Sequence, residues 1–570
     1  MKPYIIFFLI QLPCMIYAQL NLSGSYVSSF GKSVNNFNFF ENRININSDW
    51  NDWTSWLELE HSNPPELGKK IIGIRKFRFE YQANKYGVKI GDLYEFWGNG
   101  LIFNMLDDQS IDMDTGIRGG LFSYNFGFLS AEYLIGAHQS FRSTTKAPDF
   151  DERIPNYKTD YKLQAGKISF DISRNRFEFF ALNVKDQHLI PTKNQYLRLK
   201  DRLFGLSFSH IFENFEADYH YAHKSHNDGK AFNLNTFLFL EDYAISISFK
   251  DYRFNELSPF DRFDFVNHPH GVYYFQQMPT VYKIHSSLYL GRVAHQIDYN
   301  DEVGFNIGIE KSHAQNGTIL LNYAQSSRHN EWALNSSSGF NSVWSIRKKS
   351  ILSSSDWRFN PFSEVYLEVN GYYDSRLFYQ ISLAKTRDIT DIFTNIYSTQ
   401  GHSFSYNMLE SITFPVLISY QLTPQNSFNF QFEYQKIKKG MIIKNPEANL
   451  GKEVFGSAFA EDIQGNTFLS IGYSRSPYWS ISIDIDNAST EDILVVENGR
   501  NNNFVENFLN PFFDKSMTWA SINYSMNLLS STLISLSYGS QRAGIFCSNG
   551  VCRNMQAFEK GIKLGVTTAF

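Results

Sequence analysis

The sequence predicts an all-β protein, a single large antiparallel transmembrane β-barrel with long extracellular loops. Three observations predict it. Apolar and polar residues alternate along nearly all of the 570-residue chain, aromatic residues are abundant although the mean hydropathy is negative, and the last segment is an alternating strand that ends in Phe570. We expect about 22 to 26 strands, since single-chain bacterial barrels prefer even numbers.

The alternating segments read as strands because successive side chains of a β-strand point to opposite faces. Residues 428–434 alternate Phe or Tyr with Asn, Gln and Glu, and residues 479–486 alternate Trp or Ile with Ser and Asp. A soluble β-sandwich also alternates. The segments here commonly span about ten residues, which is longer than the usual strand of a globular domain. Closing them into one barrel leaves no strand edge unpaired in lipid.

The composition agrees with lipid-facing strands. The chain contains 53 Phe and 33 Tyr, and aromatic residues reach 17%. A barrel with aromatic side chains toward lipid and a polar lumen explains this content together with the negative mean hydropathy. The formal net charge of -5 gives no basic excess, so no nucleic-acid partner is expected.

The N-terminus has the pattern of a secretory signal peptide. Lys2 precedes an apolar run over residues 4–16, and Ala18 supplies the small residue before the expected cleavage site. This divides the chain into a signal peptide at 1–18 and a barrel at 19–570. A lipoprotein signal at Cys14 is the alternative, although Pro13 stands where a small residue is needed. No later apolar run has the length of a membrane-spanning helix, so the predicted location is the Gram-negative outer membrane.

The last ten residues form the predicted closing strand. Leu564, Val566 and Phe570 share one face, and Lys563 lies on the other. A final edge strand of a soluble β-protein is the alternative. The segment resembles the closing strand of Gram-negative outer-membrane barrels, whose terminal aromatic residue is part of the signal read by the insertion machinery. The resemblance implies that Phe570, Val566 and Leu564 serve as a barrel-assembly signal.

The connections predict which end of the barrel faces outward. A periplasmic C-terminus places the Cys547–Cys552 segment outside, where Asn549-Gly550 indicates a tight hairpin. In an oxidising compartment, Cys547 and Cys552 are expected to form a disulfide, with a metal pair as the rival. Residues 504–512 have helical spacing within one loop. The long connections expected outside are 141–158, 252–279, 325–340, 386–402, 437–465 and 487–515.

Charged residues on the polar strand faces are the candidates for the lumen lining. Both signs occur, so the sequence indicates neither anion nor cation selectivity. A salt-bridged interior that stiffens the wall is preferred to a specific ligand site. The residues are Arg43, Glu58, Glu60, Arg78, Glu80, Lys89 and Glu433.

The chain shows no local motif for catalysis or for a cofactor. G-x-S-x-G, H-E-x-x-H and P-loop motifs are absent, so we expect neither an enzyme nor a cofactor, although a triad assembled in space stays open. Clustered Asp residues could form a calcium site and clustered His residues a transition-metal site, but solvated loop side chains are the preferred interpretation of both. Their residues are Asp107, Asp108, Asp112, Asp114, His220, His223, His226, His268 and His270.

Three segments carry a family resemblance. Residues 91–101 resemble an early signature of a family of exported barrel-like proteins known only as a domain of unknown function. Residues 279–292 resemble a second, weaker signature, and residues 542–558 are similar to the closing hairpin of that family. The resemblance implies a barrel and no established activity. Glycines of the first segment read as a bend or bulge in the wall, and a substrate contact at Trp97 is the lesser alternative. The family-like residues are Gly91, Asp92, Trp97, Gly98 and Gly100.

These observations predict a channel or binding protein for the passage of a small solute. The alternative is a plugged structural or interaction barrel whose extracellular loops bind a partner, and the third candidate is a membrane-embedded hydrolase. A TonB-coupled transporter is less favoured, because no separate plug domain precedes the first strands. The expected partners are outer-membrane lipid, the barrel-assembly machinery during insertion, and either a small solute or an extracellular or periplasmic protein.

Overall fold

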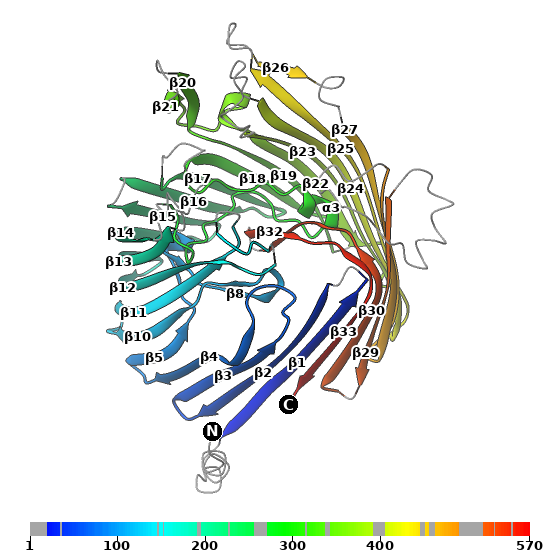
Figure 1. Cartoon of the computed structure of the whole chain (residues 1–570), viewed down its shortest axis with the longest axis horizontal. Helices are drawn as coiled ribbons and strands as arrows, with labels where there is room; N and C mark the ends of the chain where they lie inside the picture. Colours follow the sequence, from blue (N-terminus) through cyan, green and yellow to red (C-terminus); the bar gives the residue numbers. More distant parts are fainter. Residues whose placement is uncertain are drawn as a thin grey trace.

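The computed structural model shows a closed antiparallel barrel (Figure 1). It describes residues 20–34, 37–144, 147–151, 153–190, 195–225, 228–255, 271–313, 316–336, 342–391, 405–444, 451–454, 462–489, 517–528, 530–548 and 551–570. The predicted signal peptide at 1–18 and the predicted loop helix at 504–512 lie outside these residues.

Twenty-four strands form the wall, which confirms the predicted fold class and falls within the expected strand number. Each strand pairs with its neighbours in chain order. The wall strands are β1 (Asn21–Ser33), β2 (Asn38–Trp50), β3 (Trp53–Ser62), β4 (Ile71–Gln82), β5 (Tyr86–Leu93), β10 (Ile117–Asn125), β11 (Leu129–Arg142), β12 (Tyr157–Ile172), β13 (Asn175–Ile190), β14 (Gln195–Ile211), β15 (Phe215–Lys224), β16 (Gly229–Phe239), β17 (Tyr243–Arg253), β18 (Glu302–His313), β19 (Gly317–Ser327), β22 (Phe362–Tyr372), β23 (Leu377–Asp391), β24 (Ser405–Thr423), β25 (Asn426–Lys444), β27 (Asp462–Arg475), β28 (Trp479–Ala488), β29 (Met517–Leu528), β30 (Thr532–Gln541) and β33 (Phe558–Ala569).

The barrel closes between its first and last strands. β33 pairs with β1 from Ser25↔Ala569 to Ser33↔Gly561. Beyond the last pair, Phe570 and Gly24 exchange two backbone hydrogen bonds of 2.8 and 3.0 Å. The Phe570 side chain is 64% exposed, and Leu564 is also exposed, so both lie on the outer face of the closing strand.

The outer face of the wall is apolar. On β28, Ile481 and Ile483 are exposed, whereas the inward Asp486 is buried. Exposed Phe, Tyr, Ile and Leu side chains recur around the barrel, including Phe79 and Phe179 at 54% and 53%. Such a face is stable in hydrocarbon and would be unfavourable in water.

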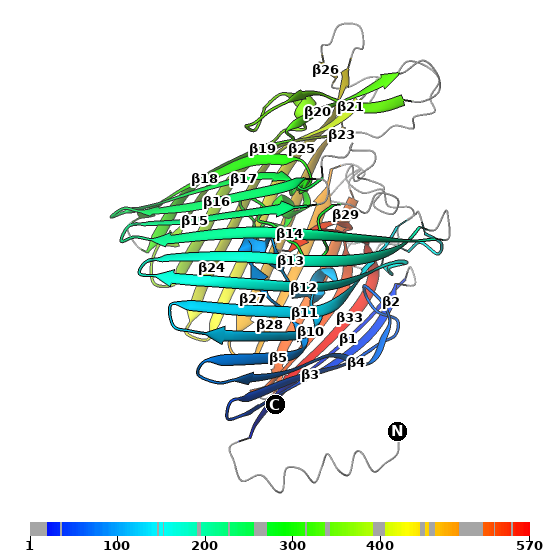
Figure 2. The same cartoon turned by 90° about the vertical axis from the view of Figure 1, so that its left-hand side faces the viewer.

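The two ends of the barrel differ, as Figure 2 shows. Short turns such as residues 51–52 and 173–174 lie at the end where β1 begins and β33 ends, which we call the terminal end. Strand order places all six predicted long connections at the opposite end, the loop end. The prediction that 252–279 faces outside is wrong for its described part, because Tyr273, Phe275 and Met278 are buried inside the barrel. The described elements there include β20 (Asn330–Ser336), β21 (Ser342–Lys349), η4 (Trp357–Phe359) and β26 (Gly451–Val454). No helix in the described ranges is long and apolar enough to cross a membrane.

Candidate functional site

Three connections between wall strands turn into the lumen. They join β5 to β10, β17 to β18 and β30 to β33, and Figure 1 shows them within the ring of strands. We call their described residues, 94–116, 271–301, 542–548 and 551–557, the luminal body. Its small elements are β6 (Phe96–Trp97), η2 (Gly98–Gly100), β7 (Phe103–Asn104), β8 (Asp107–Asp108), η3 (Gln109–Ile111), β9 (Met113–Asp114), α3 (Leu288–Arg292), β31 (Gly544–Ser548) and β32 (Val551–Met555).

The three parts of the luminal body contact one another. The side-chain amide of Gln276 donates to the carbonyl oxygen of Leu101 at 2.6 Å. The guanidinium of Arg553 donates to the carbonyl oxygen of Ile111 at 2.9 Å. The three connections therefore meet inside the barrel, although they lie far apart in the chain.

Aromatic side chains form the core of the luminal body. Trp97 is 2% exposed, and its ring centroid lies 5.1 Å from that of Phe103, which lies 5.5 Å from that of Phe275. Trp97 also stacks on Phe180 of β13, and buried side chains of β11 to β17 complete the cluster. The composition indicated a lumen that is polar throughout. The structure differs, because the lumen is apolar on this side. Burial of Trp97 in this core leaves it no surface for a substrate.

The glycines of the 91–101 segment have two different roles. Gly91 has a φ of 122° and marks the end of the pairing between β4 and β5. Gly98 and Gly100, with φ of 60° and 82°, lie in the lumen and not in the wall, where a bend was expected. A Cβ on Gly100 would stand 2.1 Å from the carbonyl oxygen of Gln277, so only glycine allows this close contact.

Asp92 replaces the backbone pairing that ends at Gly91. Its carboxylate accepts the N–H of Phe77 at 2.8 Å and the Nε of Arg118 at 3.0 Å. The side chain therefore joins β4, β5 and β10 where the chain leaves the wall for the lumen.

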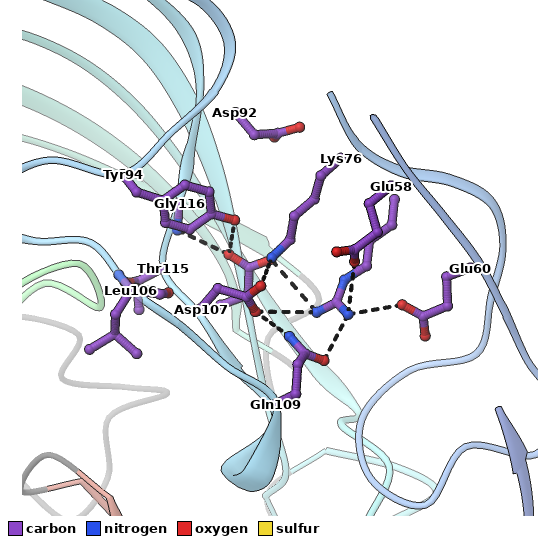
Figure 3. Close-up of polar contacts among 12 residues, drawn as sticks. Glu58, Glu60, Lys76, Asp92, Tyr94, Leu106, Asp107, Gln109, Thr115 and Gly116 are labelled. Carbon is purple, nitrogen blue, oxygen red and sulfur yellow. Dashed lines mark hydrogen bonds and ion pairs between the residues drawn. The ribbon is translucent and has the colours of Figure 1, made fainter. Parts of the chain in front are cut away.

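A buried charge network joins the luminal body to β3 and β4, and Figure 3 shows it between Glu58, Glu60 and Gln109. The guanidinium of Arg75 lies 2.9 Å from Glu60 and 3.3 Å from Glu58, and it donates to Gln109 at 2.7 Å. It also pairs with Asp107 at 3.6 Å. Arg75 and both glutamates are less than one tenth exposed, so each charge depends on its partners rather than on water.

Lys76 continues this network through the luminal body. Its ammonium pairs with Asp107 and, at 3.1 Å, with Asp114. Burial alone would raise the pKa of Asp114, but the charges of Lys76 and Arg75 outweigh it and hold the pKa below its usual value. Burial and the neighbouring Asp114 raise the pKa of Tyr94, whose hydroxyl donates to Asp114 at 2.9 Å.

A β-bulge places both cations on the inner face. Lys76 lies opposite Glu58, while Ile74 lies opposite Leu59, so Arg75 is an extra residue in β4. Strict alternation would put Arg75 and Lys76 on opposite faces, and sequence reasoning therefore missed both. Two adjacent cations inside an alternating segment are the signal that could have revealed them.

Of the other residues predicted for the lumen, Arg78, Glu80 and Lys89 form local ion pairs. Arg78 and Glu80 pair at 2.5 Å, and Lys89 pairs at 2.9 Å with Glu95 of the luminal body. Arg43 lines a pocket of about 130 Å³ beside the charge network.

The candidate metal ligands are engaged in other contacts. Asp112 pairs with Arg553 at 3.3 Å, and His220 shares a 2.7 Å hydrogen bond with Ser207. His223 pairs with an aspartate at 2.8 Å. Among the described residues no group of three His, Cys, Asp or Glu side chains is arranged to hold a metal ion. His226, His268 and His270 lie outside those residues.

Glu433, predicted in the lumen lining, holds the start of α3. Its carboxylate accepts the hydroxyl of Ser287 at 2.7 Å and the N–H groups of Leu288 and Tyr289 at 3.0 and 2.9 Å. The carbonyl oxygen of Tyr289 accepts the side-chain amide of Gln435 at 3.0 Å. The first N–H groups of a helix lack intrahelical partners, so a buried wall carboxylate supplies them here.

Asp486 of β28 holds the same part of the luminal body. Its carboxylate lies 2.8 Å from Arg292 and 3.2 Å from Arg542, and it accepts the hydroxyl of Tyr289 at 2.8 Å. All four side chains are buried. We call Asp486, Glu433 and their partners in the luminal body the latch.

A chamber of about 500 Å³ lies on the terminal side of the latch. Its lining comes from β1, β2, β24, β25, β27 to β30, β33 and Glu66, and about half of the lining residues are Ser, Asn or Gln. Glu66 and Lys563 are the charged side chains among the described residues of the lining, and they pair at 3.1 Å. The chamber therefore offers neutral hydrogen-bonding groups beside apolar surface, and its two charges compensate each other.

Cys547 and Cys552 are direct cross-strand partners in the register of β31 and β32. The sequence predicted that this hairpin extends outward from the barrel. That prediction is wrong, because the hairpin belongs to the luminal body. The disulfide between the two cysteines stays a prediction.

His295 of the luminal body predicts a pH dependence of stability. Burial alone would lower its pKa, but the carboxylates of Asp388 at 3.0 Å and Glu302 at 3.3 Å raise it to about 9. Since this exceeds the value in an unfolded chain, the stabilisation is complete below about pH 6.5 and is lost as the pH rises through 9. We expect the contribution of His295 to stability to be about 3 kcal/mol smaller at pH 10 than at pH 6, measured by urea unfolding of the wild-type and variant proteins in detergent micelles. His295→Gln should remove most of this difference, and an equal difference in the variant would contradict the assignment.

No curated protein matches the chain. Among solved structures, the siderophore receptor PirA from Pseudomonas aeruginosa is 7% identical, with a TM-score of 0.41 over 96% of this chain and 80% of that one. The siderophore receptor PiuA from Acinetobacter baumannii is 9% identical, with a TM-score of 0.43 over 97% and 82%. The copper transporter OprC is 9% identical, with a TM-score of 0.39 over 97% and 81%. At these scores the likenesses carry no argument about activity.

One family profile matches most of the chain. It covers residues 41–570 and is described as a family of unknown function, DUF6029. The match includes all three segments whose sequences resemble such a family, and it confirms that resemblance. The chain therefore belongs to the DUF6029 family of unknown function.

Proposed function

We propose that this protein is an outer-membrane barrel that binds a small solute in its lumen and controls the passage of that solute by movement of the luminal body. The apolar outer face supports insertion in a bilayer. The predicted export signal at 1–18 and the terminal Phe570 support the Gram-negative outer membrane and the barrel-assembly machinery as the route.

The observation that carries the proposal is the luminal body itself. A barrel of this strand number is wide enough for an aqueous channel unless internal segments fill it. Here buried apolar packing fills the side of β11 to β17, and the latch crosses toward β25 and β28. The chamber beyond the latch supplies a polar binding space. This arrangement favours a closed, solute-binding state over an open channel, a choice that the sequence alone leaves undecided.

Single-channel recording in a planar bilayer tests the proposal, with heat-modifiable gel migration as the control for folding. We expect the wild-type protein to give conductance steps at least roughly tenfold smaller than those of an unobstructed barrel of similar width. Stable large steps from the folded wild-type protein would contradict a closed lumen. They would return the interpretation to an open channel.

A further inference from the structure

A second space, with mixed polar and apolar lining, lies between β2 to β4 and the luminal body. Asn47, Trp56 and Arg78 stand in one row of paired residues across β2, β3 and β4. They face Tyr94 and Asp107 of the luminal body across a groove of about 460 Å³. The chamber lining includes Ser29 and Phe30 of β1, and the groove lining begins on the neighbouring strand with Asn47 of β2.

Aromatic rings give the groove a rigid apolar surface. The ring centroids of Trp56 and Tyr94 lie 6.2 Å apart. The indole N–H of Trp56 donates to Asn45 at 3.3 Å, and the guanidinium carbon of Arg78 lies 5.5 Å from the indole centroid. These contacts fix Trp56 in place, so a ligand that packs on it loses little side-chain entropy of the protein.

The charges around the groove and the chamber are compensated. Arg78 is paired with Glu80, and Asp107 is paired with Lys76 and Arg75. In the chamber, Lys563 is paired with Glu66. An ionic solute would have to bring its charge into a space that offers no excess of the opposite charge, and such burial is costly.

The chamber instead offers groups that both donate and accept hydrogen bonds. Ser480 and Ser525 share a 2.6 Å hydrogen bond, and Ser537 donates to Asn523 at 2.6 Å. Hydroxyl groups rotate, so each can exchange its present partner for a hydroxyl of a solute without leaving a buried polar atom unpaired.

We propose that groove and chamber bind an uncharged saccharide of about two or three rings. Sugar hydroxyls match the Ser, Asn and Gln lining, and the apolar C–H faces of sugar rings match Trp56 and Tyr94. Each space has the volume of an ordinary ligand pocket, which is about 300–1,000 Å³. The inference rests on the proposed function and names the class of solute.

Isothermal titration of the purified full-length barrel in detergent tests this. The probes are maltose, cellobiose, lactose, sucrose and maltotriose, with glucuronate and citrate as charged comparators. We expect at least one neutral saccharide to bind and neither comparator to bind. Trp56→Ala should weaken binding by roughly tenfold. Trp53→Ala is the matched control, because Trp53 lies on the same strand with its side chain exposed on the outer face, and it should bind like the wild type.

A second variant guards against a folding defect at Trp56. Ser482→Val removes one chamber hydroxyl and should weaken the same saccharide, whereas Ile483→Val on the outer face of β28 should not. Binding of a charged comparator only, no binding of any neutral probe, or unchanged binding by both folded lumen variants would overturn the inference. The proposed function would survive these results if opening the latch still raises conductance.

Discussion

Asp486→Ala should convert a closed barrel into a conducting one. The substitution removes the acceptor shared by Arg292, Arg542 and Tyr289 and leaves two buried guanidinium groups without their carboxylate. Breaking a buried ion pair typically costs about 3–5 kcal/mol, which changes an equilibrium between two states by more than about 100-fold. Because the substitution destabilises the closed state alone, α3 and the β31–β32 hairpin should detach from β25 and β28. We expect the mean single-channel conductance to rise on the order of tenfold.

Asp484→Ala is the matched control for this experiment. Asp484 lies two residues earlier on the inner face of β28, and its carboxylate accepts from Ser470 and Asn523, which both belong to the wall. Its loss should leave the conductance at the wild-type value. Equal conductance in folded Asp486→Ala and wild-type protein would refute the latch, even if both barrels migrate as heat-modifiable species.

The wall of this protein was predictable because lipid imposes a local pattern. Every second residue of a wall strand faces hydrocarbon, so apolar residues recur at every second position of the sequence. Ile481 and Ile483 of β28 follow that pattern and are exposed on the outer face. The same alternation predicts an inward Glu433, but it contains no information about the luminal partners of that carboxylate.

The luminal body was not predictable by this reasoning because its contacts are not local. Gln276 and Leu101 bond across 175 positions of the chain. Trp97 is buried by residues from three separate segments, and the short elements around it have no regular period. Arg75 was missed for a different reason, since one extra residue in β4 moves it to the inner face. The candidate site therefore depends on the departures from the pattern that identifies the fold.

Arg75→Ala should produce the largest loss of stability, because this one guanidinium serves Glu58, Glu60 and Asp107. Removing it leaves three carboxylates in a poorly hydrated region with Lys76 as their remaining cation, and we expect a loss of about 3–5 kcal/mol in the free energy of unfolding. Urea unfolding in detergent, followed by heat-modifiable migration, measures this.

Arg78→Ala on the same strand is the control for charge removal. Arg78 pairs with Glu80 and is 28% exposed, so the loss of this pair should cost less than about 1 kcal/mol. The charge network anchors the luminal body to β3 and β4, so Arg75→Ala should also speed proteolysis of residues 94–116, whereas Arg78→Ala should not. If both variants lose the same small amount of stability and resist protease equally, the network does not hold the luminal body. The latch at Asp486 and Glu433 would then be its main attachment to the wall.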